Sequence, residues 1–558
     1  MAYVIAIDAG TTSVRSALVD ETGSIVDISN RKITSYFAHP GWVEQDPTQI
    51  WDAVVATLYD LMARVQDRHY PANTSGTRTT TSPSTTIAAI GITNQRETIV
   101  AFDRSNGKPL HKAIVWQDRR TALYSKHLID QGLQPLFRTK TGLVLDPYFS
   151  ATKIHWLLEN GDLALPKSSP DLGFATIDAW ILWNLSGGCN GGFFATEPSN
   201  ASRTLLFDIS EMKWSQELCS IFDIPIRSLP EVSTSCGRFA KVNCAQLGQA
   251  TKALNAVPIT GILGDQQAAL FGQACLKPTM AKITYGTGSF VLRNMGRKMP
   301  DPVDGLLTTL AWDLGEYAGQ GISQARNTNH AADTTARPDT DAQGSICYAL
   351  EGSSFSSGAA IEWMIDGIGL IERAEALEPL ALSVQDNGGV TFVPAFAGLG
   401  SPFWDPSARA IITGITRGTR KGHIARALLE GIAYQVRDML DAMQAASDLP
   451  LSVLRADGGA AQMNLLLQLQ ANQIQSTISR PRSIESTVLG AAMLAGLGVG
   501  VWGNLDDLSL LWSKDVDFYP DIDAYGTAIA GTGDAASAGT HCDNWLEAIE
   551  RSRGWAKA

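Results

Sequence analysis

The sequence predicts an α/β protein of two similar domains that face each other across a cleft. Its 558 residues exceed what one hydrophobic core normally organises, so two large domains are expected. A strand, a Gly-Thr turn and a second strand occupy residues 4–19, and the same order returns at residues 280–292. Polar residues follow the apolar strands at 87–92 and 113–116, where open α/β sheets place their ligands. The repeat predicts that the two turns meet in the cleft.

Composition is typical of a soluble globular enzyme, with 44% hydrophobic and 18% charged residues. The net charge of -12 argues against nucleic acid or an anionic membrane as the main partner. Seven cysteines form no CxxC pair, which indicates reduced thiols and a cytoplasmic location. No basic and apolar leader precedes the first strand. The longest apolar stretch, 488–502, is too short and too rich in glycine to span a bilayer, so we expect a packed helix there.

The elements follow in order from local patterns. Residues 3–7 predict a buried strand, and the Gly-Thr-Thr tip after Asp8 predicts a hairpin. Asp46 and Pro47 predict the start of a helix, because Asp suits the N-cap and Pro suits the first helical position. Further helices are expected at about 423–443, after Gly458-Gly459 and at 544–549. Residues 72–86 and 324–344 are almost entirely small and polar, which predicts flexible surface insertions.

Three glycine turns predict a nucleotide site. Backbone amides in tight Gly-Thr turns form anion-binding concavities, so the turns at 10–13 and 286–289 suit a polyphosphate. A third turn, Gly458-Gly459 before a helix, would let a nucleotide approach the backbone. Asp8, just before the first turn, is then expected to bind Mg²⁺ through water. The sequence has no GxxxxGK[ST] loop, protein-kinase motif set or dinucleotide GxGxxG fingerprint.

A second group of residues predicts a site for a small polyol. Arg96, Glu97 and Asp265 provide a cation and two carboxylates that suit neighbouring hydroxyl groups. Trp116, Tyr148 and Phe290 would wall its carbon side. The residues alone leave the alternatives open: an exposed charge pair, aromatic residues of the core, and a turn or cap role for Asp265.

Several longer motifs resemble the FGGY carbohydrate kinase family over nearly the whole chain. The most specific motifs are Asn94-Gln95-Arg96-Glu97-Thr98 and Trp116-Gln117-Asp118-Arg119-Arg120-Thr121. The segments 8–13, 40–47, 146–153, 196–204, 264–272 and 284–288 are similar as well, and residues 148–160 match the first family signature. Within the family, these motifs are most similar to the members that phosphorylate glycerol.

The resemblance implies two actin/hexokinase-like (ribonuclease H-like) ATPase domains with an interdomain cleft. We expect an N-terminal domain at 1–262, a C-terminal domain at 263–520 and a tail with a short helix at 521–558. The implied reaction uses MgATP and glycerol and gives sn-glycerol 3-phosphate and ADP. Family analogy also implies a homodimer or homotetramer.

The resemblance also assigns roles position by position. Asp265 is implied as the general base, and the residues implied for glycerol are Arg96, Glu97, Trp116, Tyr148, Asp265, Gln266 and Phe290. The residues implied for ATP are Thr11, Thr12, Ser13, Arg15, Gly286, Thr287, Gly358, Glu362, Gly459 and Met463, with Asp8 for the metal. Two competing hypotheses remain: a related kinase for another polyol or keto-sugar, and a weakly catalytic ATP-binding regulator on the same fold.

The sequence departs from the family at three places. Met463 stands where members often have an adenine-contacting Asn, and Glu362 replaces a Gln, so base selectivity is open. The loop linked to inhibition by fructose 1,6-bisphosphate is Lys252-Ala253-Leu254-Asn255-Ala256 here, without its glycines and arginine. We therefore predict that this sugar phosphate does not inhibit the protein. A dose-dependent loss of activity at low millimolar concentration would contradict that prediction.

Overall fold

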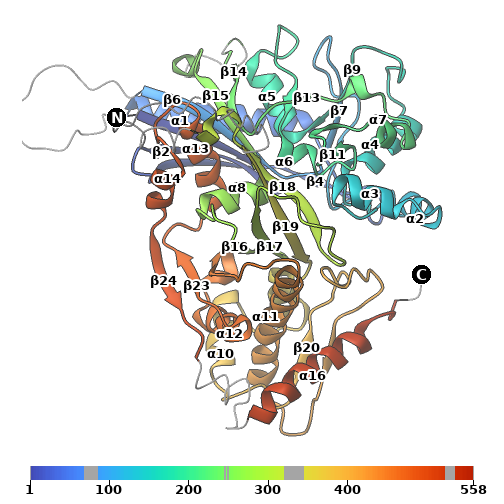
Figure 1. Cartoon of the computed structure of the whole chain (residues 1–558), viewed down its shortest axis with the longest axis vertical. Coiled ribbons are helices and arrows are strands. Elements are labelled where there is room, and N and C mark those ends of the chain that lie inside the picture. The colour runs from blue at the N-terminus through green and yellow to red at the C-terminus, as the bar shows by residue number, and fades with distance from the viewer. Residues whose placement is uncertain are drawn as a thin grey trace, which may run out of the picture.

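The computed structural model describes residues 2–67, 86–243, 245, 247, 251–319, 345–521 and 535–556 (Figure 1). The expected insertions lie outside the described residues, except that Thr86 opens a strand. Among the described residues, no helix combines the length and apolarity needed to cross a bilayer.

The first large sheet occupies the upper half of Figure 1 and has six strands. Its central strand pairs antiparallel with the next strand of the chain and parallel with the strand on its other side. In spatial order the strands are β14 (Cys236–Lys241), β15 (Pro258–Gly264), β6 (Thr86–Asn94), β1 (Ala2–Ala9), β2 (Ser13–Asp20) and β3 (Ile25–Lys32).

The second large sheet has seven strands and repeats the pattern of the first. In spatial order they are β18 (Leu307–Asp313), β19 (Ile346–Ser354), β17 (Ser289–Gly296), β16 (Met280–Tyr285), β22 (Val453–Asp457), β23 (Ile478–Pro481) and β24 (Lys514–Phe518). The run β3-β2-β1-β6-β15 corresponds to β19-β17-β16-β22-β23, with the same parallel and antiparallel pairings. The predicted duplication into two similar α/β units is therefore confirmed.

A smaller, five-stranded sheet accompanies the first domain. Its strands are β4 (Ser35–Tyr36), β5 (Glu44–Gln45), β8 (Ala113–Ile114), β7 (Ile99–Asp103) and β9 (Leu172–Thr176). Three two-stranded sheets are formed by β10 (Ala195–Thr196) with β13 (Glu231–Val232), β11 (Phe207–Asp208) with β12 (Lys213–Trp214), and β20 (Thr391–Val393) with β21 (Ile411–Thr413).

Helices occur along the whole described part of the chain. In the N-terminal half they are α1 (Pro47–Asp67), α2 (Ala122–Asp130), α3 (Gln134–Thr141), α4 (Ser150–Asn160), α5 (Ile177–Ser186), α6 (Pro198–Ala201) and α7 (Gln216–Ile221). The later ones are α8 (Asp265–Gly272), α9 (Gly358–Glu362), α10 (Leu377–Ala381), α11 (Lys421–Ala445), α12 (Asn464–Ile474), α13 (Ser486–Leu497), α14 (Leu505–Leu511) and α16 (Ala535–Ser552).

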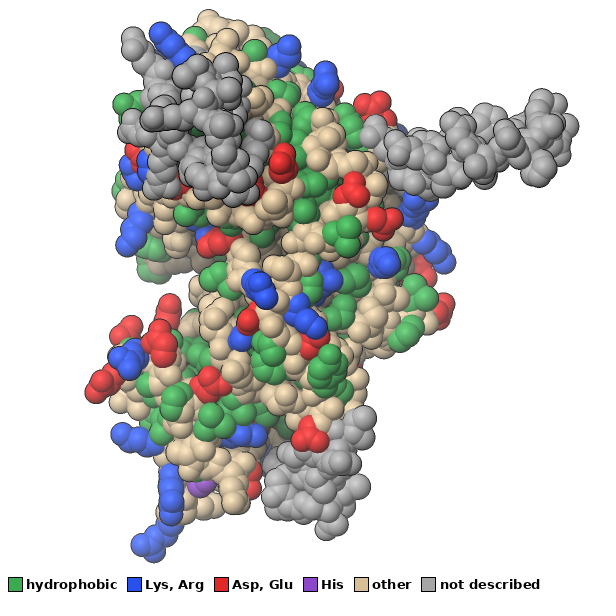
Figure 2. All heavy atoms as spheres, turned by 90° about the vertical axis from the view of Figure 1, so that its left-hand side faces the viewer, with side chains coloured by type: hydrophobic (Ala, Val, Ile, Leu, Met, Phe, Trp, Pro, Cys, Tyr) green, Lys and Arg blue, Asp and Glu red, His purple; other side chains and the backbone are tan. Residues whose placement is uncertain are grey.

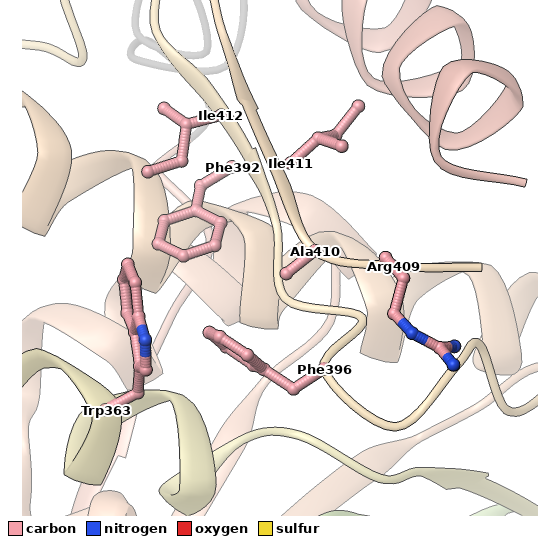
Figure 3. A pocket seen from close by; sticks show the side chains of 7 residues that line it. All are labelled: Trp363, Phe392, Phe396, Arg409, Ala410, Ile411 and Ile412. Carbon is pink, nitrogen blue, oxygen red and sulfur yellow. The ribbon is translucent and has the colours of Figure 1, made fainter. Parts of the chain in front are cut away.

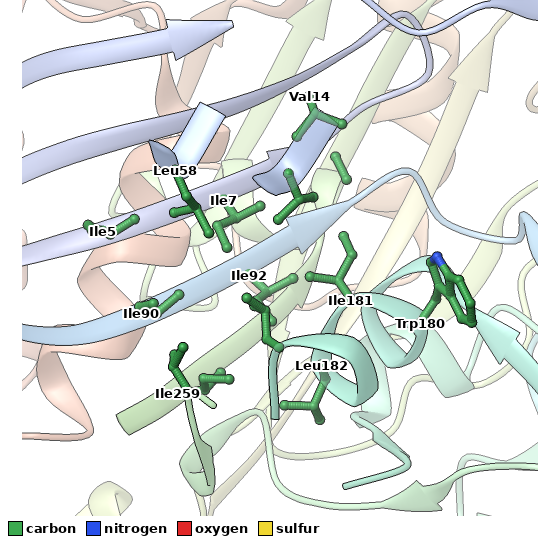
Figure 4. Packing of buried hydrophobic residues seen from close by; sticks show 14 of the residues in the cluster. Ile5, Ile7, Val14, Leu58, Ile90, Ile92, Trp180, Ile181, Leu182 and Ile259 are labelled. Carbon is green, nitrogen blue, oxygen red and sulfur yellow. The ribbon is translucent and has the colours of Figure 1, made fainter. Parts of the chain in front are cut away.

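Strand β1 is buried on both faces because a helix layer covers each side of the sheet. Ile5 and Ile7 pack in a cluster with Leu58 of α1 and Ile181 of α5 (Figure 4). Val4, on the opposite face, packs in a separate cluster with residues of α8 and α13. Two buried faces explain why β1 is a continuous apolar run instead of an alternating one.

Helix α13 belongs to the C-terminal half of the chain but packs on the first sheet, against β1, β6 and β15 (Figure 1). Glycines make the contact close. A Cβ atom added to Gly91 of β6 would lie 2.2 Å from the carbonyl oxygen of Ala491. One added to Gly490 would lie 1.8 Å from the carbonyl oxygen of Ala268 in α8. The two halves of the chain are therefore interlocked.

Several predicted elements differ in extent from the observed ones. The helix expected at 423–443 is α11, Lys421–Ala445, and the apolar stretch at 488–502 overlaps α13, Ser486–Leu497, which begins two residues earlier and ends five residues earlier. The C-terminal helix, expected at 544–549, is much longer as α16, Ala535–Ser552. The reason is compositional. The small and polar residues before Asn544 carry no hydrophobic pattern with helical spacing, so only the segment with Trp545 and Ile549 shows an amphipathic pattern in the sequence.

Candidate active site

The first Gly-Thr turn joins β1 to β2 and is held from several sides. The amide of Gly10 donates to the carbonyl oxygen of Ser13 at 3.0 Å, which closes the turn. The indole nitrogen of Trp116 donates to Thr11 Oγ1 at 2.9 Å. Thr12 is exposed and Ser13 is half-buried. The turn is thus fixed while its outer residues remain open to a ligand.

The second Gly-Thr turn joins β16 to β17 and lies against the start of α9. The amide of Gly286 donates to the carbonyl oxygen of Gly288 at 2.9 Å. The amide of Gly358 donates to the carbonyl oxygen of Gly286, also at 2.9 Å. A Cβ atom on Gly358 would lie 2.5 Å from the Gly286 oxygen, so the contact requires glycine. Gly286 and Thr287 are exposed. The structure therefore brings Gly358 to the second turn.

The third turn, Gly458-Gly459, follows β22 directly beside the second one. Gly458 has a φ of +89°, and an added Cβ atom would lie 2.4 Å from the carbonyl oxygen of Tyr285. At Gly459 an added Cβ atom would meet nothing within 4 Å, so the backbone is open on that side. The open backbone is the feature that suits close approach of a flat or anionic group.

Both Gly-Thr turns line one cavity of about 830 Å³, as the repeat predicted. The predicted site residues on its walls are Thr11, Thr12, Trp116, Tyr148, Thr287 and Phe290. The rings of Trp116 and Tyr148 meet edge to face with their centres 5.6 Å apart. The aromatic residues are thus on the wall of a cavity between the two domains, and the alternative that they only fill a core does not hold.

Asp265 opens helix α8, with one oxygen held and the other available. Its Oδ1 accepts the Gln266 amide at 2.7 Å and lies 3.1 Å from Arg96 Nε. Among the described residues no hydrogen bond to its Oδ2 is found. The side chain is 31% exposed, whereas that of Arg96 is 2% exposed. A carboxylate fixed by one oxygen, with the other free, has the geometry of a general base.

The glycine before Asp265 sets the approach of Arg96. A Cβ atom at Gly264 would lie 2.7 Å from both Cγ and Cδ of Arg96. Because the Arg96 guanidinium is itself tied at several points, its stem cannot move aside freely. The absence of a side chain at Gly264 therefore lets Arg96 lie directly beside Asp265.

Arg96 belongs to a buried network of charges. Its Nη1 lies 2.6 Å from Glu351 Oε2, and its Nη2 donates to Glu351 Oε1 at 3.1 Å, which forms a bidentate pair. Arg203 donates from Nε to Glu97 Oε1 at 2.7 Å and from Nη2 to Glu351 Oε1 at 2.9 Å. Two arginines and the carboxylates of Glu97, Glu351 and Asp265 thus form one cluster. The alternative of an exposed charge pair at 96–97 is wrong.

Sequence reasoning missed the roles of Glu351 and Arg203 in this network. Glu351 lies on β19 with 0% of its side chain exposed. Its signal is a single acid directly after the apolar run 346–350, and a buried acid requires a cationic partner. The partner, however, is Arg96, 255 residues away, and no local pattern in the sequence pairs the two residues.

Glu97 adopts a strained backbone conformation. Its φ is +62°, in the left-handed region that residues other than glycine rarely occupy. Its Oε1 accepts from Arg203, and among the described residues no hydrogen bond to Oε2 is found. Such strain persists where surrounding contacts over-determine the conformation, commonly at functional sites. Here it places a buried carboxylate with one free oxygen beside Arg96.

Tyr148 is held by an internal lysine. Lys153, fully buried on α4, donates from Nζ to the carbonyl oxygens of Pro147 and Tyr148 at 2.6 Å and of Phe149 at 3.1 Å. Burial lowers the pKa of Lys153 to about 7. Burial also raises the pKa of Tyr148 well above its usual value, so its hydroxyl stays protonated as a hydrogen-bond donor.

Burial has opposite outcomes for the carboxylates of the site. It raises the pKa of Asp265, against the positive charges of Arg96 and Lys282, and it also raises the pKa of Glu97. Burial would raise the pKa of Glu351 too, but Arg203 and Arg96 outweigh it and lower that pKa to about 2. Among these carboxylates, Glu351 thus stays ionised, whereas the raised pKa of Asp265 favours proton exchange.

Asp8 is buried and already has one cationic partner. Its Oδ2 lies 2.6 Å from Arg15 Nη2, and Arg15 Nη1 lies 2.5 Å from Glu485 Oε2. Among the described residues no hydrogen bond to Asp8 Oδ1 is found. One free carboxylate oxygen fits the expectation that Mg²⁺ takes few protein ligands and keeps its waters.

A family assignment follows from the sequence. The model for the N-terminal domain of the FGGY family of carbohydrate kinases matches residues 3–272, and the model for its C-terminal domain matches residues 281–499. The chain belongs to this family. It is therefore a carbohydrate kinase.

Individual relatives of this kinase agree over the full length. It is 45% identical to a glycerol kinase of Trichlorobacter lovleyi over 100% of both chains. It is 44% identical to a glycerol kinase of Dechloromonas aromatica over 100% of this chain and 98% of the relative. The crystal structure of Plasmodium falciparum glycerol kinase with ADP matches with a TM-score of 0.84 and 33% identity, covering 99% and 98% of the two chains.

A more distant structure shows how widely the fold is shared. The gluconate kinase of Lactobacillus acidophilus matches with a TM-score of 0.78 at 20% identity, covering 99% of this kinase and 97% of that chain. At that identity the match concerns the fold alone. The expected fold of two actin/hexokinase-like domains is confirmed.

The two positions that depart from the family lie differently in this kinase. Glu362, at the end of α9, is exposed, whereas Met463 is 8% exposed and packs in the core cluster of the second domain. A buried methionine offers no hydrogen bond to a base edge. The selectivity of this kinase for the nucleotide base therefore stays open.

A second cavity of about 330 Å³ lies in the second domain, and none of the predicted site residues lines it. Figure 3 shows the rings of Trp363, Phe392 and Phe396 around the same space. The remaining wall residues are Arg409, Ala410, Ile411 and Ile412. Arg409 donates to the carbonyl oxygens of Pro406 and Ala408, which occupies part of its guanidinium group.

Proposed function

We propose that this kinase transfers the terminal phosphoryl group of ATP to glycerol, which gives sn-glycerol 3-phosphate and ADP. The observation that carries the proposal is Asp265, which forms one charge cluster with Arg96 and Glu97 and whose Oδ2 receives no hydrogen bond from the described residues. Arg203 of the same cluster lies 5.7 Å from the ring centre of Tyr148, which lines the cavity that both Gly-Thr turns share. Full-length identity of 42–45% to curated glycerol kinases supports glycerol as the acceptor.

At the acceptor side, Asp265 takes the proton of the attacking hydroxyl group. The free oxygen of Glu97 accepts a second hydroxyl, and Arg96 and the Tyr148 hydroxyl donate to the substrate oxygens. Gln266 binds glycerol beside Asp265, while Trp116 and Phe290 contact the carbon atoms of glycerol. Phosphoryl transfer needs positioning and charge stabilisation more than covalent chemistry, and this set of residues provides both.

At the nucleotide side, Thr11, Thr12, Ser13, Arg15 and Thr287 bind the phosphate groups. Gly286, Gly358 and Gly459 line the nucleotide, with Glu362 and Met463 toward the adenosine. Asp8 would hold Mg²⁺ through water, and the ion would neutralise phosphate charge. Arg15 contacts both Asp8 and Glu485, so its charge already lies at the metal side of the site.

The surroundings of the reaction are also proposals. We place the protein in the cytoplasm, and family analogy favours a homodimer or homotetramer. The face drawn in Figure 2 carries interspersed acidic, basic and hydrophobic side chains. Such a mixed surface, with a net charge of -12, favours a small-molecule partner over nucleic acid.

The test is ADP production from MgATP with glycerol, dihydroxyacetone, glyceraldehyde, xylulose, ribulose and gluconate in parallel, with a no-acceptor control. We expect glycerol to give the highest kcat/KM and the product to be the 3-phosphate. A preference for another acceptor would overturn the assignments of Arg96, Glu97 and Trp116 but keep Asp265 as base. ATP binding without turnover on any acceptor would favour the regulator hypothesis.

A further inference from the structure

A lysine beside the proposed base has no role in the reaction described so far. Lys282 lies in the middle of β16 with 0% of its surface exposed. Ala281, Ile283 and Tyr285 of the same strand face the hydrophobic core under α11 and α12. Side chains alternate along a strand, so Lys282 and Thr284 face the opposite side, toward α8.

The contacts of Lys282 lead to the catalytic end of α8. Its Nζ donates to Gln266 Oε1 and to Thr284 Oγ1, the latter at 3.0 Å. Gln266 directly follows Asp265, and the backbone amide of Gln266 donates a hydrogen bond to Asp265 Oδ1. A buried ammonium group needs nearby negative charge, and two neutral oxygens alone do not supply it.

The charged groups that face Lys282 come from four elements. Asp265 opens α8, Asp457 ends β22, Glu351 lies on β19 and Arg96 follows β6. Asp457 is 1% exposed, and its Oδ1 has no hydrogen-bond partner among the described residues. Glu351 is already paired with two arginines. The carboxylates left for Lys282 to balance are therefore Asp265 and Asp457.

We propose that Lys282 is a positioning residue of the transfer reaction, whose ammonium group orients the Gln266 carboxamide and keeps the Asp265 carboxylate ionised. The proposal rests on the proposed function, since it gives Asp265 the role of base. Removing the charge would leave Arg96 as the remaining cation that lowers the pKa of Asp265. The proton-accepting form of Asp265 would then exist over a narrower pH range.

The test is the pH profile of kcat/KM for wild type, Lys282→Met and Lys282→Arg. In Lys282→Met the acidic limb should move up by about one pH unit, with about tenfold lower kcat/KM below it. Lys282→Arg should restore the acidic limb, because arginine keeps a positive charge at this position.

Arg455→Met is the matched control. Arg455 pairs in register with Lys282 on the neighbouring strand, but it donates to the carbonyl oxygen of Gln273 and stacks on Trp512, 3.8 Å from the ring centre. The Arg455→Met substitution removes a cation from the same sheet without changing the surroundings of Asp265. The acidic limb of this variant's pH profile should therefore match that of wild type. Lys282→Gln replaces the methionine variant if that variant does not fold.

An unchanged acidic limb in a folded, charge-free variant would overturn the proposal, as would a failure of Lys282→Arg to restore it. The profile is measured with glycerol or, if the panel identifies another acceptor, with that acceptor. A wrong acceptor therefore contradicts the proposed function, and an unmoved limb contradicts the role of Lys282.

Discussion

At the scale of single residues, the site is organised by buried side-chain charges that pair with one another. Glu351 pairs with both Arg96 and Arg203, while Glu97 and Asp265 each keep one oxygen that receives no hydrogen bond from the described residues. A guanidinium held on several sides cannot turn toward solvent, so the free oxygens keep their direction. The residues that touch the substrate are thus positioned by residues that do not.

The first prediction concerns the base. Asp265→Asn should bind ATP like wild type but lower kcat by about 10²–10⁴-fold, because an amide cannot accept the proton of the hydroxyl group. Calorimetric titration with ATP and a steady-state assay measure the two effects separately. A variant that retains a third of wild-type turnover would show that Asp265 is not the base.

The second prediction concerns the buried network. Glu351→Gln leaves Arg96 and Arg203 without their shared carboxylate, and breaking such a pair lowers the free energy of unfolding by about 3–5 kcal/mol. Urea-induced unfolding followed by fluorescence measures the loss.

The matched control for that prediction is Asp130→Asn, which breaks the exposed ion pair with Lys126. Side chains there are 59–70% exposed, so the change should stay under about 1 kcal/mol. Equal losses in both variants would contradict the assignment of Glu351 as the centre of the network.

At the scale of elements, short segments hold the site residues in place. Arg203 follows the short helix α6, whose N-cap residue Glu197 accepts the backbone amides of Ser199 at 2.9 Å and Asn200 at 2.8 Å. Ser199 Oγ in turn accepts the amide of Gly264 at 2.9 Å. One capping glutamate is thereby connected both to Arg203 and to the residue before Asp265.

The third prediction follows from the pKa of that cap. Burial raises the pKa of Glu197 from 4.5 to about 7, against its hydrogen bonds from Ser199 and Ser235. Between those values the folded protein holds a proton that the unfolded chain has released, so raising the pH lowers the free energy of unfolding. The loss should reach up to about 3 kcal/mol by pH 7 and disappear in Glu197→Gln.

Urea midpoints at pH 5, 6, 7 and 8 measure this slope. Glu211→Gln, at an exposed glutamate paired with Lys213, serves as control and should keep the wild-type slope. If Glu197→Gln also keeps it, the carboxyl group of Glu197 does not titrate in the folded protein.

The sequence could predict much of these elements and little of what joins them. Local patterns identified both Gly-Thr hairpins, the start of α1 at Pro47 and the position of Asp265, because turn and cap preferences act over a few residues. Pairing of Glu351 with Arg96, and the contact of Lys282 with Gln266, depends on tertiary packing. No local pattern encodes which face of β16 meets α8.

At the scale of the whole molecule, two similar sheets are joined by a helix that crosses between them. Helix α13 follows β23 of the second sheet, yet it lies on the first sheet and on α8 through the close contacts at Gly91, Gly261 and Gly490. The start of α8 carries Asp265. Packing of α13 therefore fixes the base relative to both sheets.

The fourth prediction tests that crossing. In Gly490→Ala, the added methyl group would overlap the carbonyl oxygen of Ala268, so α8 and α13 must separate. We expect about 1–3 kcal/mol lower stability and a reduced kcat. Gly418→Ala, where the nearest atom lies 3.7 Å from the added Cβ, should change neither. A fully stable and active Gly490→Ala protein would contradict the proposed importance of this contact.

The crossing helix also has a consequence for how the protein is made. Val4 and Ala6 of the first strand leave the ribosome early, but Val488, Ala491 and Leu494, which cover the same face of the sheet, are translated near the end. Until α13 emerges, the nascent chain exposes that apolar face, and such surfaces are prone to aggregate. Synthesis of this kinase should therefore depend on chaperones that shield the first sheet throughout most of translation, and a chain stopped before residue 486 should be insoluble.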